Sequence, residues 1–272
     1  MRIPKGGIAF FDSGIGGLTV LKACREKLPE EIFYYYGDNA HAPYGNLPYK
    51  KIRKYVFKAF RAFTRLRVKA VVLACNTVTA LCIDELRKKY KFPIIGTEPA
   101  IRSAAKAGGE VLVLCTRATY ESPRFRALCQ NSQANATIKA YPCDGLAGEI
   151  ERRLFDTSYD YAPYFPKAAP SSVVLGCTHY IFLKERIAAY YGCDVYDGND
   201  GVARRLQTAL KNRKNCFRRP FLTTVNKVKQ KTNKRSPKIN EKSAENNGLK
   251  NLFFLGKQRG KNTFIYKQMF GL

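Results

Sequence analysis

The sequence predicts an α/β protein built from two doubly wound parallel sheets, and three features of the 272-residue chain support this. Apolar, strand-like segments alternate with helix-like segments along most of its length. An apolar run followed by a cysteine occurs at 71–77 and again at 173–179, which indicates two similar halves. Hydrophobic residues make up 45% of the composition, which is enough to form a core in each half.

The first cycle of elements ends near residue 97. Short, continuous apolar runs, typical of buried parallel strands, predict strands at 7–11, 32–36, 69–74 and 93–96. Helical spacing of apolar residues predicts helices at 18–28, 48–66 and 79–90. A glycine-rich turn at 12–17 follows the first strand, and a long loop at 37–45 follows the second.

The second cycle repeats the pattern. Its expected strands lie at 110–114, 137–141, 172–175 and 194–197. Its expected helices lie at 122–129, where Pro123 suits the first turn, and at 144–154, 182–191 and 201–211. Because this cycle is complete near residue 205, the strand at 252–255 and the helix at 263–270 are expected to fold back on the first domain. The predicted domains are therefore 1–97 plus 206–272, and 98–205.

The chain is strongly basic, with 48 Lys+Arg against 21 Asp+Glu and a net charge of +27. Much of the excess lies in a basic insert at 212–250; from Lys211 to Lys250 there are 13 basic and two acidic residues. The insert lacks an apolar period, so it is interpreted as a loop or partly disordered surface segment. The alternative is a contact with nucleic acid or an anionic surface, which no accompanying motif supports.

Composition also limits the compartment and the cofactors. No run approaches the roughly 18 apolar residues of a membrane span, and the N-terminus lacks a signal-peptide layout, so a cytoplasmic protein is expected. Nine cysteines without a CxxC pair are expected to be thiols. The two histidines do not sit at ligand spacing from a cysteine cluster, so no metal site is predicted.

Cys75 and Cys177 are the leading catalytic candidates. In doubly wound sheets, ligands bind beyond the carboxyl ends of the strands, where both cysteines fall. Each precedes polar residues and a helix whose N-terminus favours thiolate, although an isolated cysteine of this kind is more often a packing residue. One thiol on each side of a ligand suits moving a proton from one face of a carbon to the other. The remaining cysteines are interpreted as packing residues, with Cys115 at most a wall of the site.

Four motifs occur in order along the chain: Asp12-Ser13-Gly14-Ile15-Gly16-Gly17, Pro43-Tyr44-Gly45, Cys75-Asn76-Thr77 and Gly176-Cys177-Thr178-His179. In these the chain resembles the glutamate racemases of the aspartate/glutamate racemase family, over nearly all of its length to about residue 210 and again from Phe253. The resemblance implies two α/β domains related by a pseudo-twofold axis, with the active site between them. It also implies cofactor-independent interconversion of L- and D-glutamate for peptidoglycan synthesis.

The resemblance assigns a role to each motif residue. Cys75 is the base toward D-glutamate and Cys177 the base toward L-glutamate, assisted by Asp12 and His179 respectively. Glu149 is expected near the second thiol, although a solvated helix carboxylate is the alternative. The substrate's polar groups are expected to be held by Asp12, Ser13, Tyr44, Gly45, Asn76, Thr77, Thr178 and His179.

The chain departs from the family pattern in two places, and alternative functions stay open. Ile181 stands where the family commonly has proline, and the basic insert is not part of the family pattern. An aspartate racemase or a related two-cysteine isomerase is the nearest alternative activity. A polyanion-binding protein that uses the insert is an alternative from another class. The sequence leaves open whether the chain acts alone or as a homodimer.

Overall fold

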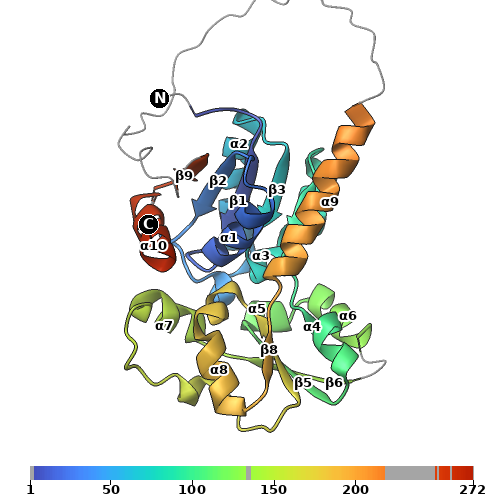
Figure 1. The fold of residues 1–272 in the computed structure, drawn as a ribbon, viewed down its shortest axis with the longest axis vertical. Coiled ribbons are helices and arrows are strands. Elements are labelled where there is room, and N and C mark those ends of the chain that lie inside the picture. The colour runs from blue at the N-terminus through green and yellow to red at the C-terminus, as the bar shows by residue number, and fades with distance from the viewer. Residues whose placement is uncertain (1–2, 133–135, 218–248, 250, 258, 272) are drawn as a thin grey trace, which may run out of the picture.

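The computed structural model describes residues 3–132, 136–217, 249, 251–257 and 259–271, and two parallel sheets organise them (Figure 1). The first sheet has the strand order β4-β3-β1-β2-β9, formed by β1 (Ile8–Asp12), β2 (Phe33–Gly37), β3 (Ala70–Leu73), β4 (Ile94–Gly96) and β9 (Leu252–Leu255). The second has the order β6-β5-β7-β8, formed by β5 (Glu110–Cys115), β6 (Thr137–Pro142), β7 (Ser172–Gly176) and β8 (Asp194–Tyr196). The predicted fold class is confirmed.

Helices cover both faces of the first sheet. They are α1 (Gly17–Lys27), α2 (Tyr49–Arg65), α3 (Asn76–Lys89), α9 (Asn199–Phe217) and α10 (Arg259–Phe270). Successive residues of β1 point to opposite faces, so Phe10 packs with α1, α9 and α10, whereas Phe11 packs with α2 and α3. Burial on both faces explains why β1 is apolar up to Asp12.

The second sheet carries shorter helices and several single turns. The α-helices are α4 (Ile101–Ala104), α5 (Arg117–Tyr120), α6 (Pro123–Gln130), α7 (Leu146–Arg153) and α8 (Lys184–Tyr191). The 3₁₀ turns of the described chain are η1 (Tyr44–Asn46), η2 (Ala105–Ala107), η3 (Ala162–Tyr164) and η4 (Thr178–Leu183). Ser122 caps α6 by accepting the N–H of Phe125 at 3.1 Å, with Pro123 in the first turn as predicted.

The chain returns to the first sheet at its end, as predicted. β9 pairs in parallel with β2, with Tyr34 opposite Phe253, and α10 follows against the same sheet. On the face that α1 covers, α9 lies toward the β3–β4 edge of the first sheet and α10 toward the β9 edge (Figure 1). Val202 and Ala203 of α9 already belong to the core that contains Leu18, so this helix covers the first sheet from its first turns.

Several element boundaries differ from the predicted ones. The stretch after Cys177 begins as η4, and α8 begins at Lys184 instead of residue 182. α9 begins at Asn199, where the Asp197 carboxylate accepts the Asn199 N–H at 3.0 Å, and it continues to Phe217. The predicted basic insert at 212–250 lies mostly outside the described residues. Within the described part of the chain, no helix is long and apolar enough to cross a membrane.

Candidate active site

The carboxyl ends of the central strands of both sheets face one another. Asp12 ends β1, Cys75 follows β3, and Cys177 follows β7. Contacts between side chains join the two halves here. The Thr178 hydroxyl donates to Asp12 Oδ1 at 3.4 Å, and the Thr77 and Thr116 hydroxyls lie 3.0 Å apart. The two cysteine segments therefore meet at a single interface between the halves.

Cys75 occupies the residue before α3, and its thiol is nearly buried. Its side chain is 5% exposed, and Sγ lies 3.6 Å from Ser13 Oγ. Burial, helped by the Asp12 carboxylate, raises the pKa of the Cys75 thiol to about 12, although the Val78 N–H at the start of α3 opposes the shift. The resting group is consequently a thiol, which is a proton donor.

Asp12 lies wholly buried beneath the glycine-rich turn. Its Oδ2 accepts the Gly14 N–H at 2.9 Å. Burial raises the pKa of this carboxyl, while the nearby His179 and the backbone N–H groups of Gly14 and Gly17 lower it. A Cβ at Gly16 would lie 2.6 Å from Thr178 Oγ1, so this glycine lets the two halves approach closely.

Cys177 begins a chain of polar contacts on the opposite side. Its Sγ lies 3.8 Å from His179 Nδ1, and His179 Nε2 lies 2.8 Å from Glu151 Oε1. Burial opposes charge on the His179 imidazole, but its contacts with Cys177 and Glu151 prevail and raise its pKa well above the ordinary value. His179 can therefore remain protonated beside the thiol at neutral pH.

Glu151, on α7, is the carboxylate that the sequence prediction missed. Glu149 was expected near the second thiol, but its oxygens pair with Arg152 and Arg153, with Arg153 Nε at 3.3 Å. Residues two apart on a helix face nearly opposite directions, so only one of the two carboxylates can point inward. The inward face is marked by Leu146, Ala147 and Ile150, to which Glu151 is adjacent; helical periodicity could have identified it.

Glu151 also joins parts of the chain that are far apart in sequence. Besides His179, its Oε1 accepts the Ile15 N–H of the glycine-rich turn at 2.9 Å, and its Oε2 lies 3.5 Å from Lys261 Nζ on α10. Burial would raise the pKa of Glu151, but these partners outweigh it and hold the pKa below its usual value. An ionised Glu151 thus ties the second cysteine segment to the first sheet.

The remaining predicted substrate-binding residues surround this interface. The Tyr44 hydroxyl donates to Asp38 Oδ2 at 2.6 Å, and Asn76 Nδ2 donates to the Thr97 carbonyl at 3.1 Å. Gly45 packs against Thr116, where an added Cβ would meet the threonine Cβ at 3.0 Å. Sequence reasoning did not assign a substrate-binding role to Thr116 or Thr119, whose hydroxyls lie within 3.5 Å of Thr77 Oγ1.

The arrangement can perform acid–base chemistry on both sides of a bound carbon. Cys75 and Cys177 come from different sheets, and the charge of Cys177 contributes to the raised pKa of Cys75, so the two thiols lie within electrostatic reach. Cys75 has Ser13 and Asp12 beside it, whereas Cys177 has His179 and Glu151. Each thiol thus has its own set of polar partners for gaining or losing a proton.

Comparison with known proteins gives the family. A family model described as Asp/Glu/Hydantoin racemase matches residues 19–206. The glutamate racemase of Clostridium botulinum (strain Okra / Type B1) is 37% identical over 222 residues, which cover 78% of this chain and 86% of the relative.

Two solved structures share the fold. Escherichia coli glutamate racemase in complex with L-glutamate and the activator UDP-MurNAc-ala matches with a TM-score of 0.68 and 28% identity, covering 76% of this chain and 83% of that one. The Francisella tularensis glutamate racemase in complex with D-glutamate matches with a TM-score of 0.65 and 29% identity, covering 77% and 82%. With its paired cysteine segments and these matches, the chain belongs to the Asp/Glu/hydantoin racemase family and is an isomerase.

Proposed function

We propose that this protein interconverts L- and D-glutamate by a two-base mechanism that uses Cys75 and Cys177 and requires no cofactor. The observation that carries the proposal is the placement of two nearly buried thiols at equivalent strand ends of the two sheets, each with its own polar partners. Relatives solved with L-glutamate and with D-glutamate support the choice of substrate.

The proposed reaction moves one proton off the α-carbon and places another on its opposite face. From D-glutamate, the Cys75 thiolate takes the α-proton, and the Cys177 thiol donates its proton to the other face of the carbanion. From L-glutamate, the roles reverse. After each turnover one cysteine is left protonated and the other ionised, so the pair must exchange protons before the next turnover in the same direction.

Surrounding groups make this proton transfer feasible at an otherwise weakly acidic carbon. His179 stabilises charge at Cys177, and Glu151 orients the imidazole through its 2.8 Å contact. For Cys75, whose pKa burial raises to about 12, the substrate ammonium group supplies the positive charge that favours the thiolate. Positioned hydrogen bonds and electrostatics then stabilise the developing carbanion.

The decisive experiment measures α-proton exchange. Purified protein is dialysed against chelator and incubated with L-glutamate in D₂O without pyridoxal phosphate, while optical rotation and α-deuteration are followed together. Optical rotation should fall to zero as deuterium enters the α-position. A requirement for pyridoxal phosphate would contradict the proposal, and faster turnover of aspartate in parallel reactions would favour the aspartate alternative.

The biological role follows from the product. D-glutamate is a building block of peptidoglycan, so we propose that this enzyme supplies it for the cell wall. Expression of the chain in a bacterium that depends on added D-glutamate should remove that dependence. The Cys177→Ala variant, expressed at the same level, should fail to do so.

A further inference from the structure

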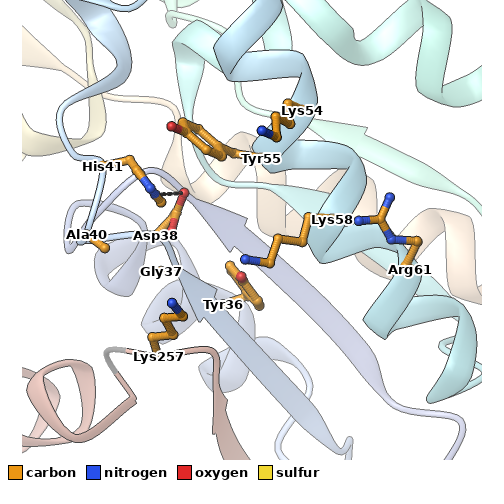
Figure 2. A pocket seen from close by; sticks show the side chains of 10 residues that line it. All are labelled: Tyr36, Gly37, Asp38, Ala40, His41, Lys54, Tyr55, Lys58, Arg61 and Lys257. Atoms are coloured by element: carbon orange, nitrogen blue, oxygen red, sulfur yellow. Dashed lines mark hydrogen bonds and ion pairs between the residues drawn. The ribbon is translucent and has the colours of Figure 1, made fainter.

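The segment that leads from β9 into α10 carries two lysines with different surroundings. Lys257 is exposed and lines a cavity of about 390 Å³ beside α2 (Figure 2). The other cations that line this cavity are Lys54, Lys58 and Arg61. Lys261 instead reaches the interface between the halves, where its Nζ lies 3.5 Å from Glu151 Oε2. Of the two lysines, Lys261 is therefore the one that contacts the polar groups of the candidate active site.

The first turn of α10 is anchored on the first sheet, which sets where Lys261 can reach. Asn262, the next residue, is fully buried, and its Nδ2 donates to the Gly37 carbonyl at the end of β2 at 3.4 Å. One turn later, Tyr266 packs in the core of the first sheet, and its hydroxyl accepts a hydrogen bond from Arg25 Nη1 on α1 at 2.6 Å. Because this backbone is anchored, the folding of α10 brings Lys261 to the Glu151 side chain.

The two carboxylate oxygens of Glu151 have different partners. Oε1 is bound by His179 Nε2 at 2.8 Å and by the Ile15 N–H at 2.9 Å, whereas Oε2 faces Lys261. A Cβ at Gly14 would lie 1.9 Å from Oε1, so the carboxylate is packed closely against the glycine-rich turn on that side. The Glu151 side chain is 9% exposed and that of Lys261 43%, so the lysine approaches the carboxylate from the solvent side.

We propose that Lys261 is a positioning residue for the second thiol. By holding Oε2, it keeps the Glu151 carboxylate turned so that Oε1 meets His179, the residue that faces Cys177. The proposal rests on the two-base function proposed above, and it extends the support of the second thiol to the C-terminal helix. Because Glu151 is nearly buried, salt screens this ion pair less than it screens a fully exposed one.

The charges around Glu151 give the sign of the expected effect. Burial raises the pKa of Glu151, whereas His179, a backbone N–H of the glycine-rich turn and Lys261 lower it. Asp12 and Tyr35 also lie within electrostatic reach of Glu151, and neither adds positive charge. Removing the lysine should therefore raise the pKa of Glu151 and weaken its hold on the imidazole.

Three variants test this role. Lys261→Met removes the charge but keeps most of the length of the side chain, and Lys261→Arg keeps the charge. Lys257→Met is the matched control, because it removes an exposed lysine of the same segment that lines the cavity instead. The pKa of Glu151 is followed by carbon NMR of its carboxyl group in the protein without substrate. The values of kcat and KM for glutamate are measured in both directions.

In Lys261→Met the pKa of Glu151 should rise. The kcat should fall about two- to fivefold in both directions with KM unchanged, as expected for a partly exposed ion pair. Lys261→Arg should retain most of the wild-type kcat, and Lys257→Met should retain all of it. The isotope effect of α-deuterated L-glutamate should increase in Lys261→Met, because Cys177 takes that proton, whereas that of α-deuterated D-glutamate should not. A smaller fraction of folded enzyme would change neither isotope effect.

The proposal is overturned by an unchanged Glu151 pKa or an unchanged kcat in Lys261→Met. It is also overturned if Lys257→Met loses as much activity, or if Lys261→Arg is as slow as Lys261→Met. A wild-type protein that does not racemise glutamate would refute the proposed function instead. The comparison of Glu151 pKa values needs no substrate, so it would still decide whether Lys261 holds the carboxylate.

Discussion

Cys75 and Cys177 look alike in sequence but differ in their surroundings. Cys75 lies next to a serine hydroxyl and a buried carboxylate, whereas Cys177 lies next to a histidine held by a glutamate. The two cysteines therefore follow equivalent strands but differ in their chemical surroundings. Such asymmetry suits an enzyme whose two substrates are mirror images at one carbon but are bound in one orientation at the side chain.

Replacing either thiol by alanine tests the two-base assignment. Cys75→Ala and Cys177→Ala should each reduce racemisation by about 10³-fold or more, because a proton must be removed and delivered on opposite faces. Cys129→Ala, at a half-buried cysteine outside the site, is the control and should keep wild-type turnover. Racemisation is measured by circular dichroism of glutamate. Wild-type turnover in Cys177→Ala would refute the assignment.

The Asp12→Asn variant should be more stable than the wild type at pH 7 but less active. The folded-state pKa of Asp12 lies above its ordinary value, so its contribution to stability is present at low pH and is lost as pH rises through that pKa. Asparagine can accept the Gly14 N–H and contact the Thr178 hydroxyl while staying neutral. The melting temperature of the variant should exceed that of the wild type at pH 7, with a smaller gain at pH 4.

The same variant should lose about 10²-fold in turnover, because the carboxylate beside Cys75 is gone. Thermal melts at the two pH values and turnover at pH 7 are sufficient to check both effects. A melting temperature below the wild-type value at pH 7 would show that the buried charge stabilises the fold.

At the scale of elements, α7 connects the halves through a single side chain. Glu151 contacts the glycine-rich turn of the first sheet and the histidine that follows the second cysteine strand. Its neighbour Glu149 pairs with Arg152 and Arg153 of the same helix, in contacts of the kind that contribute little to stability. The two glutamates thus form a matched pair for mutagenesis.

Glu151→Gln should lower the pKa of His179, because one of the contacts that oppose the effect of burial loses its negative charge. The pKa is followed by NMR of the imidazole, and turnover from L-glutamate should fall by about 10- to 100-fold. Glu149→Gln, which changes the same charge on the same helix, should alter neither quantity. An unchanged His179 pKa in Glu151→Gln would mean that the glutamate does not hold the histidine's charge.

These two glutamates also show where sequence-based prediction succeeds and fails. Continuous apolar runs predicted the central strands β1, β3, β5 and β7, because strands buried on two faces leave little choice of residue. The edge strands β6 and β8 are partly exposed and were predicted from the repeated order of elements. Local resemblance placed a carboxylate on α7 but chose Glu149, because motif matching does not register which side of the helix faces inward. The start of α8 was also missed, since η4 depends on how Thr178 and His179 pack against the first sheet.

At the scale of the whole molecule, two charged regions lie at the first sheet, and they differ in burial and in the pairing of their charges. The interface between the halves encloses Asp12, His179 and Glu151, which are paired and buried. The cavity beside α2 gathers exposed cations whose charge the described chain does not balance. The two regions are connected by Asp38, whose N–H donates to the Asp12 carbonyl at 3.0 Å and whose carboxylate holds Tyr44. Asp38 thus links the loop after β2 to the carboxyl end of β1.

The basic insert at 212–250 carries much of the net positive charge of the chain, and deleting it tests whether catalysis needs it. Residues 218–247 lie outside the described part of the structure, so the prediction rests on their composition, which is rich in lysine and poor in apolar residues. The segments on either side belong to the first sheet, through the packing of α9 on α1 and the pairing of β9 with β2.

Replacing 218–247 by a short glycine–serine linker should leave the melting temperature and glutamate turnover largely unchanged. Binding to a polyanion such as heparin should weaken, by a margin that shrinks as salt rises, because salt screens the attraction between opposite charges beyond about 10 Å at 0.1 M. Loss of folding or of turnover in this variant would instead assign the insert a structural role.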